Sequence, residues 1–359
     1  MRRGINSALF IGVLMSIFCL TPVTWGRQWQ ISEIGTAGDF LSLKLDASDN
    51  PRIAYRTRNG SVDTLTYTYF DGSSWRAQTV DNSGHAGAYC SLALDTMGYA
   101  HISYFDGAGE DLKYAYWNGS SWNTQTLDSQ GSVGGFTSIA LDKNNKSHIS
   151  YIDWGAGSVG YAHEDSSGWV IDEISALYGR TSIALDSSGN PHIAADNQYA
   201  SWDGMSWTTM TFNNGAINSD VSLALDSSDN PHIAYHDIES DILKYASWNG
   251  SNGSSWNNQI VAGLDNGGEL DMVLGNDVLP DIAYTRYGGI KYASFNGSSW
   301  DIEGVAGGSS VSIELDSKGL VHMVYTDWGK GKLMYAEEVP EPATLLLLAL
   351  GGFALRKKR

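Results

Sequence analysis

The chain has 359 residues, and its 40 acidic side chains outnumber its 22 basic ones to give a net charge of −18. The basic residues gather at the two ends, so residues 27–342 hold 16 of them against all 40 acids, a charge of −24. A surface this acidic repels phosphate backbones, which argues against a nucleic-acid partner.

Residues 1–26 are typical of an export signal. A pair of arginines precedes the apolar run Ala8–Leu20, and Thr24 and Gly26 suit positions −3 and −1 of a cleavage site. Removal of this segment leaves Cys90 as the only cysteine, so no intrachain disulfide can form. We expect Cys90 to be a small buried hydrophobe at the entrance to a strand.

A repeat of 40 to 49 residues fills the chain between its two ends. Each copy opens with a short apolar run that ends in a Leu-Asp-like step. The seven runs start at Ser42, Ser91, Ser138, Ser182, Ser222, Asp271 and Ser312. Repeats of this length that are built from short strands are typical of propeller blades.

Each repeat predicts four short strands, named a to d in chain order. Strand a is the apolar run, strand b follows a His-Ile-x-Tyr pattern, strand c follows Leu-Lys-Tyr-Ala, and a Trp opens strand d. The six internal d strands start at Trp75, Trp122, Trp169, Trp207, Trp256 and Trp300. Asx-Gly pairs between c and d, and prolines at the entrance of b, suit the turns that this order requires.

The seventh repeat stops after strand c and has no d strand of its own. Residues 27–34 carry Trp29 at the usual distance before the next strand a, so this segment is expected to complete the last blade. The predicted fold is all-β, a seven-bladed β-propeller of four-stranded blades over residues 27–337, closed by this N-terminal d strand. It is flanked by the signal peptide and a C-terminal hydrophobic sorting helix. Six or eight blades are the alternatives.

Two columns of side chains recur at the bottom face, where the a–b turns lie. Six a strands end in Asp, which we expect to cap the following turn. Five b strands open with a histidine on separate blades, too far apart to share one ion: His101, His148, His192, His232 and His322. The acidic a–b loops lack the ligand number and the closing Glu of a calcium loop. We therefore expect no metal and no cofactor, and no catalytic set stands out.

A third column lies at the top face, just after strand b, where propellers usually bind ligands. A carboxylate beside an exposed indole is a common pairing for sugars, because the ring stacks while the oxygens accept hydroxyl protons. The predicted ligand-binding set is Asp106, Asp153, Trp154, Asp237, Arg286, Tyr287, Asp327 and Trp328. The alternative is that the aspartates cap the b–c turns and that Trp covers a seam between blades.

The Asx-Gly-Ser-Ser-Trp turns, such as Asn118–Trp122, resemble the Asp-box of the sialidase-like, or BNR-repeat, propellers. The spacing from Gly to Trp is kept, and the leading Ser-x-Asp of that motif is missing. The resemblance implies the propeller architecture over residues 27–336. A sialidase-type activity would need an arginine triad, a Tyr–Glu pair and an acidic Asp at the top centre, and the sequence does not supply this set.

The C-terminal end has three elements in a fixed order. Val339, Pro340, Glu341 and Pro342 precede thirteen uncharged residues, and Arg356, Lys357, Lys358 and Arg359 follow them. Residues 338–359 thus resemble the PEP-CTERM sorting tail of exported bacterial proteins. The resemblance implies an exosortase-type sorting enzyme as a partner. The basic cluster suits the cytoplasmic side, and an apolar run shorter than the ~20 residues of a spanning helix suits a transient membrane anchor.

The sequence therefore predicts an exported, non-catalytic propeller that is sorted to the cell envelope surface or released from the cell. We expect it to bind a carbohydrate, such as an extracellular polysaccharide, or a surface protein through its top-face loops. Two alternatives stay open. The first is a glycoside hydrolase or polysaccharide lyase on a sialidase-like propeller, and the second is a structural extracellular-matrix protein without a discrete ligand.

Overall fold

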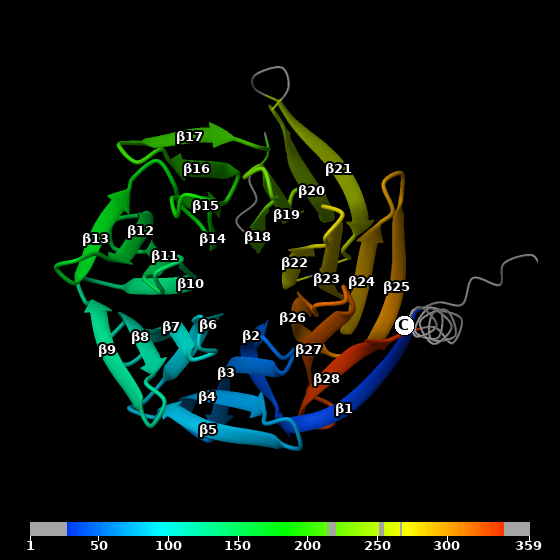
Figure 1. Ribbon diagram of the computed structural model, residues 1–359, viewed down its shortest axis with the longest axis horizontal. Helices are drawn as coiled ribbons and strands as arrows, with labels where there is room; N and C mark the ends of the chain where they lie inside the picture. Colours follow the sequence, from blue (N-terminus) through cyan, green and yellow to red (C-terminus); the bar gives the residue numbers. More distant parts are fainter. Residues whose placement is uncertain (1–26, 214, 216–219, 251–254, 266–267, 341–359) are drawn as a thin grey trace, which may run out of the picture.

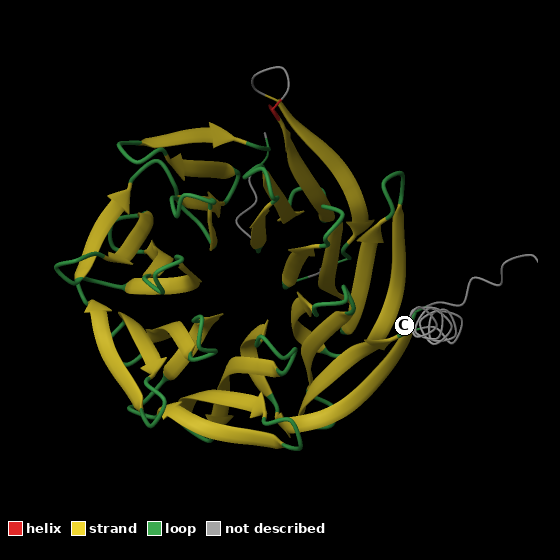
Figure 2. Cartoon of the chain, viewed as in Figure 1, coloured by secondary structure: helices red, strands yellow, loops and turns green. Residues whose placement is uncertain are grey.

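The computed structural model describes residues 27–340 except 214, 216–219, 251–254 and 266–267. Within these residues, 28 strands form seven antiparallel sheets of four strands, set as blades around a central axis (Figures 1 and 2). The predicted signal peptide and sorting helix lie outside the described residues. In the described part of the chain, no helix is long and apolar enough to cross a membrane.

The first three blades follow one another along the chain, each with strand a nearest the axis and strand d outermost (Figure 1). Blade 1 consists of β2 (Gly38–Leu45), β3 (Pro51–Asn59), β4 (Val62–Phe70) and β5 (Trp75–Asp81). Blade 2 consists of β6 (Ala86–Leu94), β7 (Ala100–Asp106), β8 (Asp111–Trp117) and β9 (Trp122–Asp128). Blade 3 consists of β10 (Val133–Leu141), β11 (Ser147–Asp153), β12 (Ser158–Glu164) and β13 (Trp169–Ile174).

Blades 4 to 6 repeat this order around the ring. Blade 4 consists of β14 (Thr181–Leu185), β15 (Pro191–Ala195), β16 (Gln198–Trp202) and β17 (Trp207–Thr211). Blade 5 consists of β18 (Val221–Leu225), β19 (Pro231–Asp237), β20 (Ile242–Asn249) and β21 (Ser255–Gly263). Blade 6 consists of β22 (Leu270–Leu274), β23 (Pro280–Arg286), β24 (Gly289–Phe295) and β25 (Trp300–Gly307).

Blade 7 joins the two ends of the described chain and confirms the predicted closure. It combines β26 (Ser309–Leu315), β27 (Val321–Asp327) and β28 (Lys332–Val339) with β1 (Gln28–Thr36) as its outer strand. In the β1–β28 ladder Ser32 lies opposite Tyr335, and Gln28 lies opposite Val339. Figure 1 shows the dark blue β1 along the red β28. Val339, predicted as part of the sorting motif, is therefore also the last residue of the closing blade.

The repeated Trp at the start of strand d packs across the seam between two blades. Each indole meets, edge to face, a Tyr on strand c of the preceding blade, with ring centroids 5.0–5.6 Å apart. The seven pairs are Trp75–Tyr335, Trp122–Tyr67, Trp169–Tyr114, Trp207–Tyr161, Trp256–Tyr199, Trp300–Tyr245 and Trp29–Tyr292. Trp29 repeats this contact at the closing blade. The Trp recurs once in each repeat because each junction between neighbouring blades needs one.

The histidine column serves the packing of each blade. In five blades a His Nδ1 is hydrogen-bonded to the hydroxyl of the same seam Tyr, in the pairs His101–Tyr114, His148–Tyr161, His192–Tyr199, His232–Tyr245 and His322–Tyr335. In blade 6, where Gly275 replaces the Asp that ends strand a, Asp281 replaces the His and accepts the hydrogen bond of Tyr292. Burial lowers the pKa of His148 to about 4, so this ring is neutral at physiological pH.

A ring of hydrogen bonds joins the seven a strands around the axis. The side chain that opens each apolar run accepts a hydrogen bond from a backbone N–H of the next a strand, at 3.0–3.2 Å. The bonds run from Leu92 to Ser42, Ile139 to Ser91, Ile183 to Ser138, Leu223 to Ser182, Met272 to Ser222, Ile313 to Asp271 and Leu43 to Ser312. The last bond links blade 7 to blade 1, so the recurrent Ser marks the inner closure of the ring.

Several a strands begin earlier than the sequence predicts. The predicted starts were the ring serines, whereas β2, β6, β10 and β26 begin three to five residues before them and contain a bulge. At each bulge one non-glycine residue has a positive φ, namely Phe40 (55°), Tyr89 (53°), Phe136 (46°) and Ser310 (49°). A bulge re-aims side chains, and this one presents the residue two places before each ring serine to the axis.

Candidate functional site

The four predicted aspartates cap the b–c turns of their own blades. Each Oδ1 accepts a hydrogen bond from a backbone N–H two or three residues later, in the pairs Asp106–Ala108, Asp153–Ala156, Asp237–Ser240 and Asp327–Lys330. Lys244 also forms an ion pair with Asp237, and Lys330 forms one with Asp327. These contacts match the turn-capping alternative for the column.

The two predicted tryptophans have different surroundings. Trp154 lies over Gly135, where an added Cβ would stand 2.1 Å from the ring, and its centroid is 5.5 Å from that of Phe105 in the neighbouring blade. It therefore covers the seam between blades 2 and 3. Trp328 is 52% exposed and lines an outer groove of about 850 Å³ between blades 6 and 7.

Arg286 and Tyr287 lie at the b–c turn of blade 6. The guanidinium of Arg286 pairs with Asp265 and stands 5.8 Å from the ring centroid of Tyr287. Tyr287 itself is 75% exposed and has a positive φ of 50°. Both residues line a small cavity of about 250 Å³ with Glu269 and Ser310.

A cavity of about 410 Å³ opens on the propeller axis, and the a strands of all seven blades line it. We call it the axial cavity. The residue two places before each ring position is, in blade order, Phe40, Tyr89, Phe136, Arg180, Asp220, Glu269 and Ser310. The first six line the axial cavity, and Ser310 lines the small cavity beside Tyr287 together with Glu269. Seven structurally equivalent positions thus carry three aromatic rings, one cation, two acids and one hydroxyl.

Three of these residues form a continuous aromatic arc of Phe40, Tyr89 and Phe136. Their ring centroids are 4.4 and 4.0 Å apart along the series. The guanidinium of Arg56 stands 4.6 Å from the ring of Phe40, and that of Arg180 stands 4.3 Å from the ring of Phe136. A cation therefore covers each end of the arc, which is a favourable contact for an aromatic face.

The backbone of the aromatic arc is fixed from the next blade. The carbonyl oxygens of Phe40, Tyr89 and Phe136 accept hydrogen bonds at 2.9 Å from Cys90 Sγ, Thr137 Oγ1 and Thr181 Oγ1, in that order. Cys90 thus takes the place of a threonine and is more than the plain hydrophobe that the sequence predicts. Burial raises the pKa of its thiol far above the usual range, so it stays protonated and able to donate.

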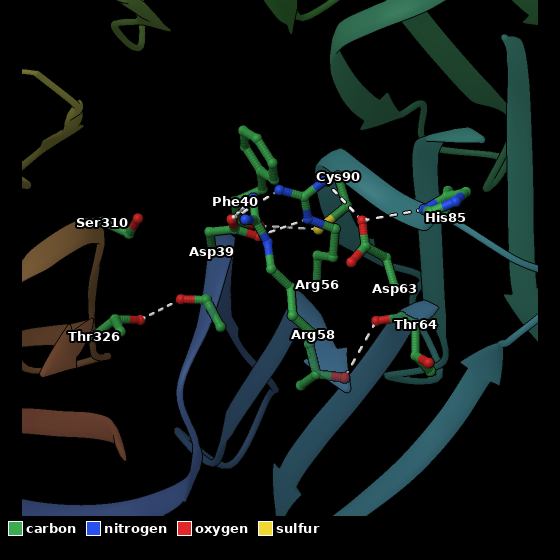
Figure 3. A network of polar contacts seen from close by, with 12 residues as sticks. Asp39, Phe40, Arg56, Arg58, Asp63, Thr64, His85, Cys90, Ser310 and Thr326 are labelled. Atoms are coloured by element: carbon green, nitrogen blue, oxygen red, sulfur yellow. Dashed lines mark hydrogen bonds and ion pairs between the residues drawn. The ribbon is translucent and has the colours of Figure 1, made fainter. Parts of the chain in front are cut away.

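Arg56 is held by a network of acids at the start of blade 1 (Figure 3). Its guanidinium donates two hydrogen bonds of 2.8 Å to the carboxylate of Asp39 and lies 3.3 Å from Asp63. Arg58 also donates to Asp39, at 2.8 Å, and His85 faces Asp63 at 3.8 Å. Two-point contact of this kind fixes the orientation of a guanidinium, so Arg56 forms a rigid end to the aromatic arc.

The opposite side of the axial cavity is an acidic arc of Asp220, Glu269 and Asp271. Asp220 pairs with Arg180 through Oδ1, and Ser310 donates a hydrogen bond of 3.0 Å to Glu269. Burial, followed by the repulsion of Asp220, raises the pKa of Glu269 to about 7. Burial also raises the pKa of Asp220, against the opposing effect of Arg180.

The axial cavity therefore has an apolar wall of aromatic rings facing a wall of hydrogen-bond acceptors. Such a lining suits a small polar ligand with an apolar face. In the part of the chain that the structure describes, no group of three His, Cys, Asp or Glu side chains is placed to hold a metal ion.

Sequence reasoning missed the axial cavity, although a signal was present. The seven equivalent positions all lie two residues before an aligned repeat start, so the alignment itself marks them as one column. The eight predicted site residues lie at the b–c turns and do not line the axial cavity. Trp154 nevertheless packs against Tyr89 and Phe136 of the aromatic arc, with ring centroids 6.2 and 6.4 Å apart.

The comparisons with known proteins bear on the C-terminal tail and on the fold. The family model of the PEP-CTERM protein-sorting motif matches residues 338–359. This confirms the predicted tail, and the motif implies processing by an exosortase. None of the curated proteins matches the sequence significantly. The resemblance to sialidase-like propellers is not confirmed.

Among solved structures, 420 chains match this fold significantly. One is the extracellular domain of a candidate hybrid two-component system from B. thetaiotaomicron, with a TM-score of 0.58, 11% identity, and coverage of 87% of this chain and 40% of that one. Another is a candidate 6-phosphogluconolactonase from Bacteroides uniformis ATCC 8492, with a TM-score of 0.51, 10% identity, and coverage of 74% and 83%. At such identities the likeness concerns the fold alone. The chain is thus an exported, PEP-CTERM-sorted protein that folds as a seven-bladed β-propeller.

Proposed function

We propose that this protein binds a carbohydrate in the axial cavity without transforming it, while the sorting tail brings it to the cell envelope surface. The observation that carries the proposal is the division of the cavity into an aromatic arc and an acidic arc. Sugars have apolar C–H faces and hydroxyl edges, so this pairing of walls is complementary to one sugar unit.

The place of the cavity supports binding to an extracellular polymer. The a strands present Phe40, Tyr89 and Phe136 near their N-terminal ends, which is the face of the d–a loops. Val339, by contrast, ends β28 beside the start of β27, because Glu338 accepts a hydrogen bond from the backbone N–H of Val321. A transient anchor that follows Val339 would leave the cavity on the face away from the membrane.

A glycan array probed with the purified protein and two variants tests this proposal. Tyr89→Gly removes the central ring of the aromatic arc, and glycine accepts the positive φ at this position without strain. We expect the affinity for the bound glycan to fall at least about tenfold. Trp328→Ala, which removes the exposed indole of the outer groove, serves as the matched control and should bind normally.

The reverse result, with binding lost in Trp328→Ala and kept in Tyr89→Gly, would move the site to the outer groove. An absence of binding to every glycan on the array would overturn the proposal and favour a structural role in the extracellular matrix.

One observation favours a hydrolase or lyase as the second candidate. Glu269, with a pKa near 7, neighbours Asp220, which Arg180 holds, and two carboxylates in different environments can divide acid and base roles. Incubation of an extracted polysaccharide with the protein would reveal shortened chains. We would then expect Glu269→Gln to abolish the cleavage.

A further inference from the structure

Two of the three acids in the acidic arc, Asp220 and Glu269, take no part in the hydrogen-bond ring of the a strands. The ring of hydrogen bonds between a strands uses Ser and Asp271 and needs neither Asp220 nor Glu269. At the equivalent position the other blades have an aromatic ring, an arginine or a serine. Burial raises the pKa of both acids although Asp220 pairs with Arg180 and Glu269 accepts a hydrogen bond from Ser310. A further donor between them would therefore stabilise their ionised forms.

The acceptors of the acidic arc are unequally satisfied. Both oxygens of Asp271 are taken, Oδ1 by Ser222 and the N–H of Met272, and Oδ2 by Ser312 and the N–H of Ile313. Asp220 pairs through Oδ1 with Arg180, but its buried Oδ2 has no hydrogen-bond partner among the described residues. One buried acceptor of the acidic arc thus lacks a donor among the described residues.

The charges in the cavity wall do not balance. Arg180 is the one cation among the wall residues in the described part of the chain, whereas Asp220, Glu269 and Asp271 are three acids of the same wall. Arg180 pairs with Asp220 and also opposes the rise in the pKa of Glu269. Outside the wall, Asp39 adds to the repulsion on Glu269, and His236 opposes the rise in the pKa of Asp220. Lys44 is stabilised as a cation by Asp271, and Arg286, which pairs with Asp265, lines the small cavity beside Glu269. A cation bound between the acids would relieve this excess of negative charge.

Building on the carbohydrate-binding function proposed above, we propose that the axial cavity recognises a protonated amino group, seated between Asp220 and Glu269 of adjacent blades. The ligand is then an amino sugar unit of a de-N-acetylated polysaccharide. Its ammonium donates to Asp220 Oδ2 and to Glu269, while its ring lies along the aromatic arc.

Binding of this kind has a proton signature. At pH 6 the carboxyl of Glu269 is largely protonated in the free protein, because its pKa is about 7. An ammonium beside it favours the ionised form, so the proton leaves as the ligand binds. A neutral sugar in the same cavity accepts or donates hydrogen bonds without this release.

The test is isothermal titration calorimetry of the purified protein at pH 6 with two probes, chitotriose and tri-N-acetylchitotriose. The probes differ in their amino groups, which are cationic in the first and acetylated in the second. Titration in two buffers of different ionisation enthalpy gives the number of protons released. We expect chitotriose to bind at least about tenfold more tightly, with release of up to about one proton.

Two variants and one control identify the groups involved. Glu269→Gln should abolish the proton release, and Asp220→Asn should weaken chitotriose binding while changing tri-N-acetylchitotriose binding little. Glu173→Gln, on the exposed d strand of blade 3, should behave as the wild type.

Equal binding of both probes without proton release would overturn this inference and leave the carbohydrate-binding function standing. Binding of neither probe, in a protein that the glycan array shows to bind another sugar, would overturn the amino-sugar assignment alone. Binding of no glycan at all would overturn both proposals.

Discussion

Glu269 shows how one partly buried carboxyl can couple the cavity to pH. Its carboxyl has a pKa near 7 in the folded chain, against 4.5 for the ordinary group, with burial as the largest cause. An acid with a raised pKa stabilises the fold fully below its unfolded pKa and loses that contribution as the pH rises through the folded value. The stabilising contribution of the Glu269 carboxyl is therefore lost between pH 4.5 and pH 7.

We predict that the free energy of unfolding of the wild type falls between pH 5 and pH 8 by about 2 kcal/mol more than that of Glu269→Gln. The amide cannot ionise, so the variant lacks this part of the pH dependence. Urea unfolding of both proteins at the two pH values measures the difference. Parallel pH profiles would show that Glu269 is ionised already at pH 5.

The ring serines offer a second prediction at this scale. Ser138→Ala leaves the N–H of Ile183 without its acceptor inside the ring, which should cost about 1–2 kcal/mol of unfolding free energy. Ser166→Ala, in the exposed c–d turn of the same blade, is the control and should change stability by less than about 0.5 kcal/mol. Similar losses in both variants would contradict a specific role for the ring.

Among the elements, β1 is the first strand of the described chain, yet it pairs with β28, the last one. Its ladder with β28 is reinforced by the indole of Trp29, which donates a hydrogen bond of 3.1 Å to Glu303 and meets Tyr292 edge to face. Arg27 adds an ion pair of 2.8 Å to Glu338. The closing blade thus uses the same seam contact as the others.

Removal of that contact should loosen only the closing blade. We predict that Trp29→Ala lowers the unfolding free energy by about 3 kcal/mol, the low end for a Trp because the side chain is half-buried, and raises hydrogen exchange in β28. Trp122→Ala removes the equivalent indole from an internal strand and serves as the comparison. In Trp122→Ala, hydrogen exchange should rise in β8, the partner of the strand that carries Trp122, and should stay slow in β28. Unchanged exchange in β28 of Trp29→Ala would show that the ladder closes without the indole.

The elements could be predicted from the sequence because their determinants repeat. Every seam needs a Trp and every inner strand needs a Ser or Asp acceptor, so the same letters recur at the same spacing. The cavity wall could not be predicted in this way, since Phe40, Arg180 and Glu269 share a position without sharing a side-chain type. Phe40, Tyr89 and Phe136 also depend on bulges and positive φ for their placement, which residue identity at these positions does not reveal.

The whole molecule has two unlike faces. The a–b turns, with Lys143 and Lys318, lie at the end of the blades where β28 finishes, and the b–c turn with Lys330 lies at the other. All three lysines are exposed. In a chain that is anchored to the membrane by its tail, Lys143 and Lys318 would therefore face the membrane, and Lys330 would face the medium.

We predict that a membrane-impermeant amine reagent labels Lys330 faster than Lys143 and Lys318 while the protein is attached to the envelope. The purified protein without attachment is the control, and its three lysines should react at similar rates. Mass spectrometry of the labelled peptides gives the rates. Equal labelling on attached protein would contradict the proposed outward orientation of the axial cavity.

The pairing of Arg27 with Glu338, 311 residues apart, also bears on export. In export led by the predicted N-terminal signal, the segment that contains Trp29 crosses the membrane first, and its partner strand β28 crosses last. Before β28 has crossed, β1 has no partner strand, and its free edge can pair with strands of other chains. Because β28 ends at Val339 and the sorting-motif match begins at residue 338, the strand that closes the propeller and the sorting tail emerge at nearly the same point of translocation.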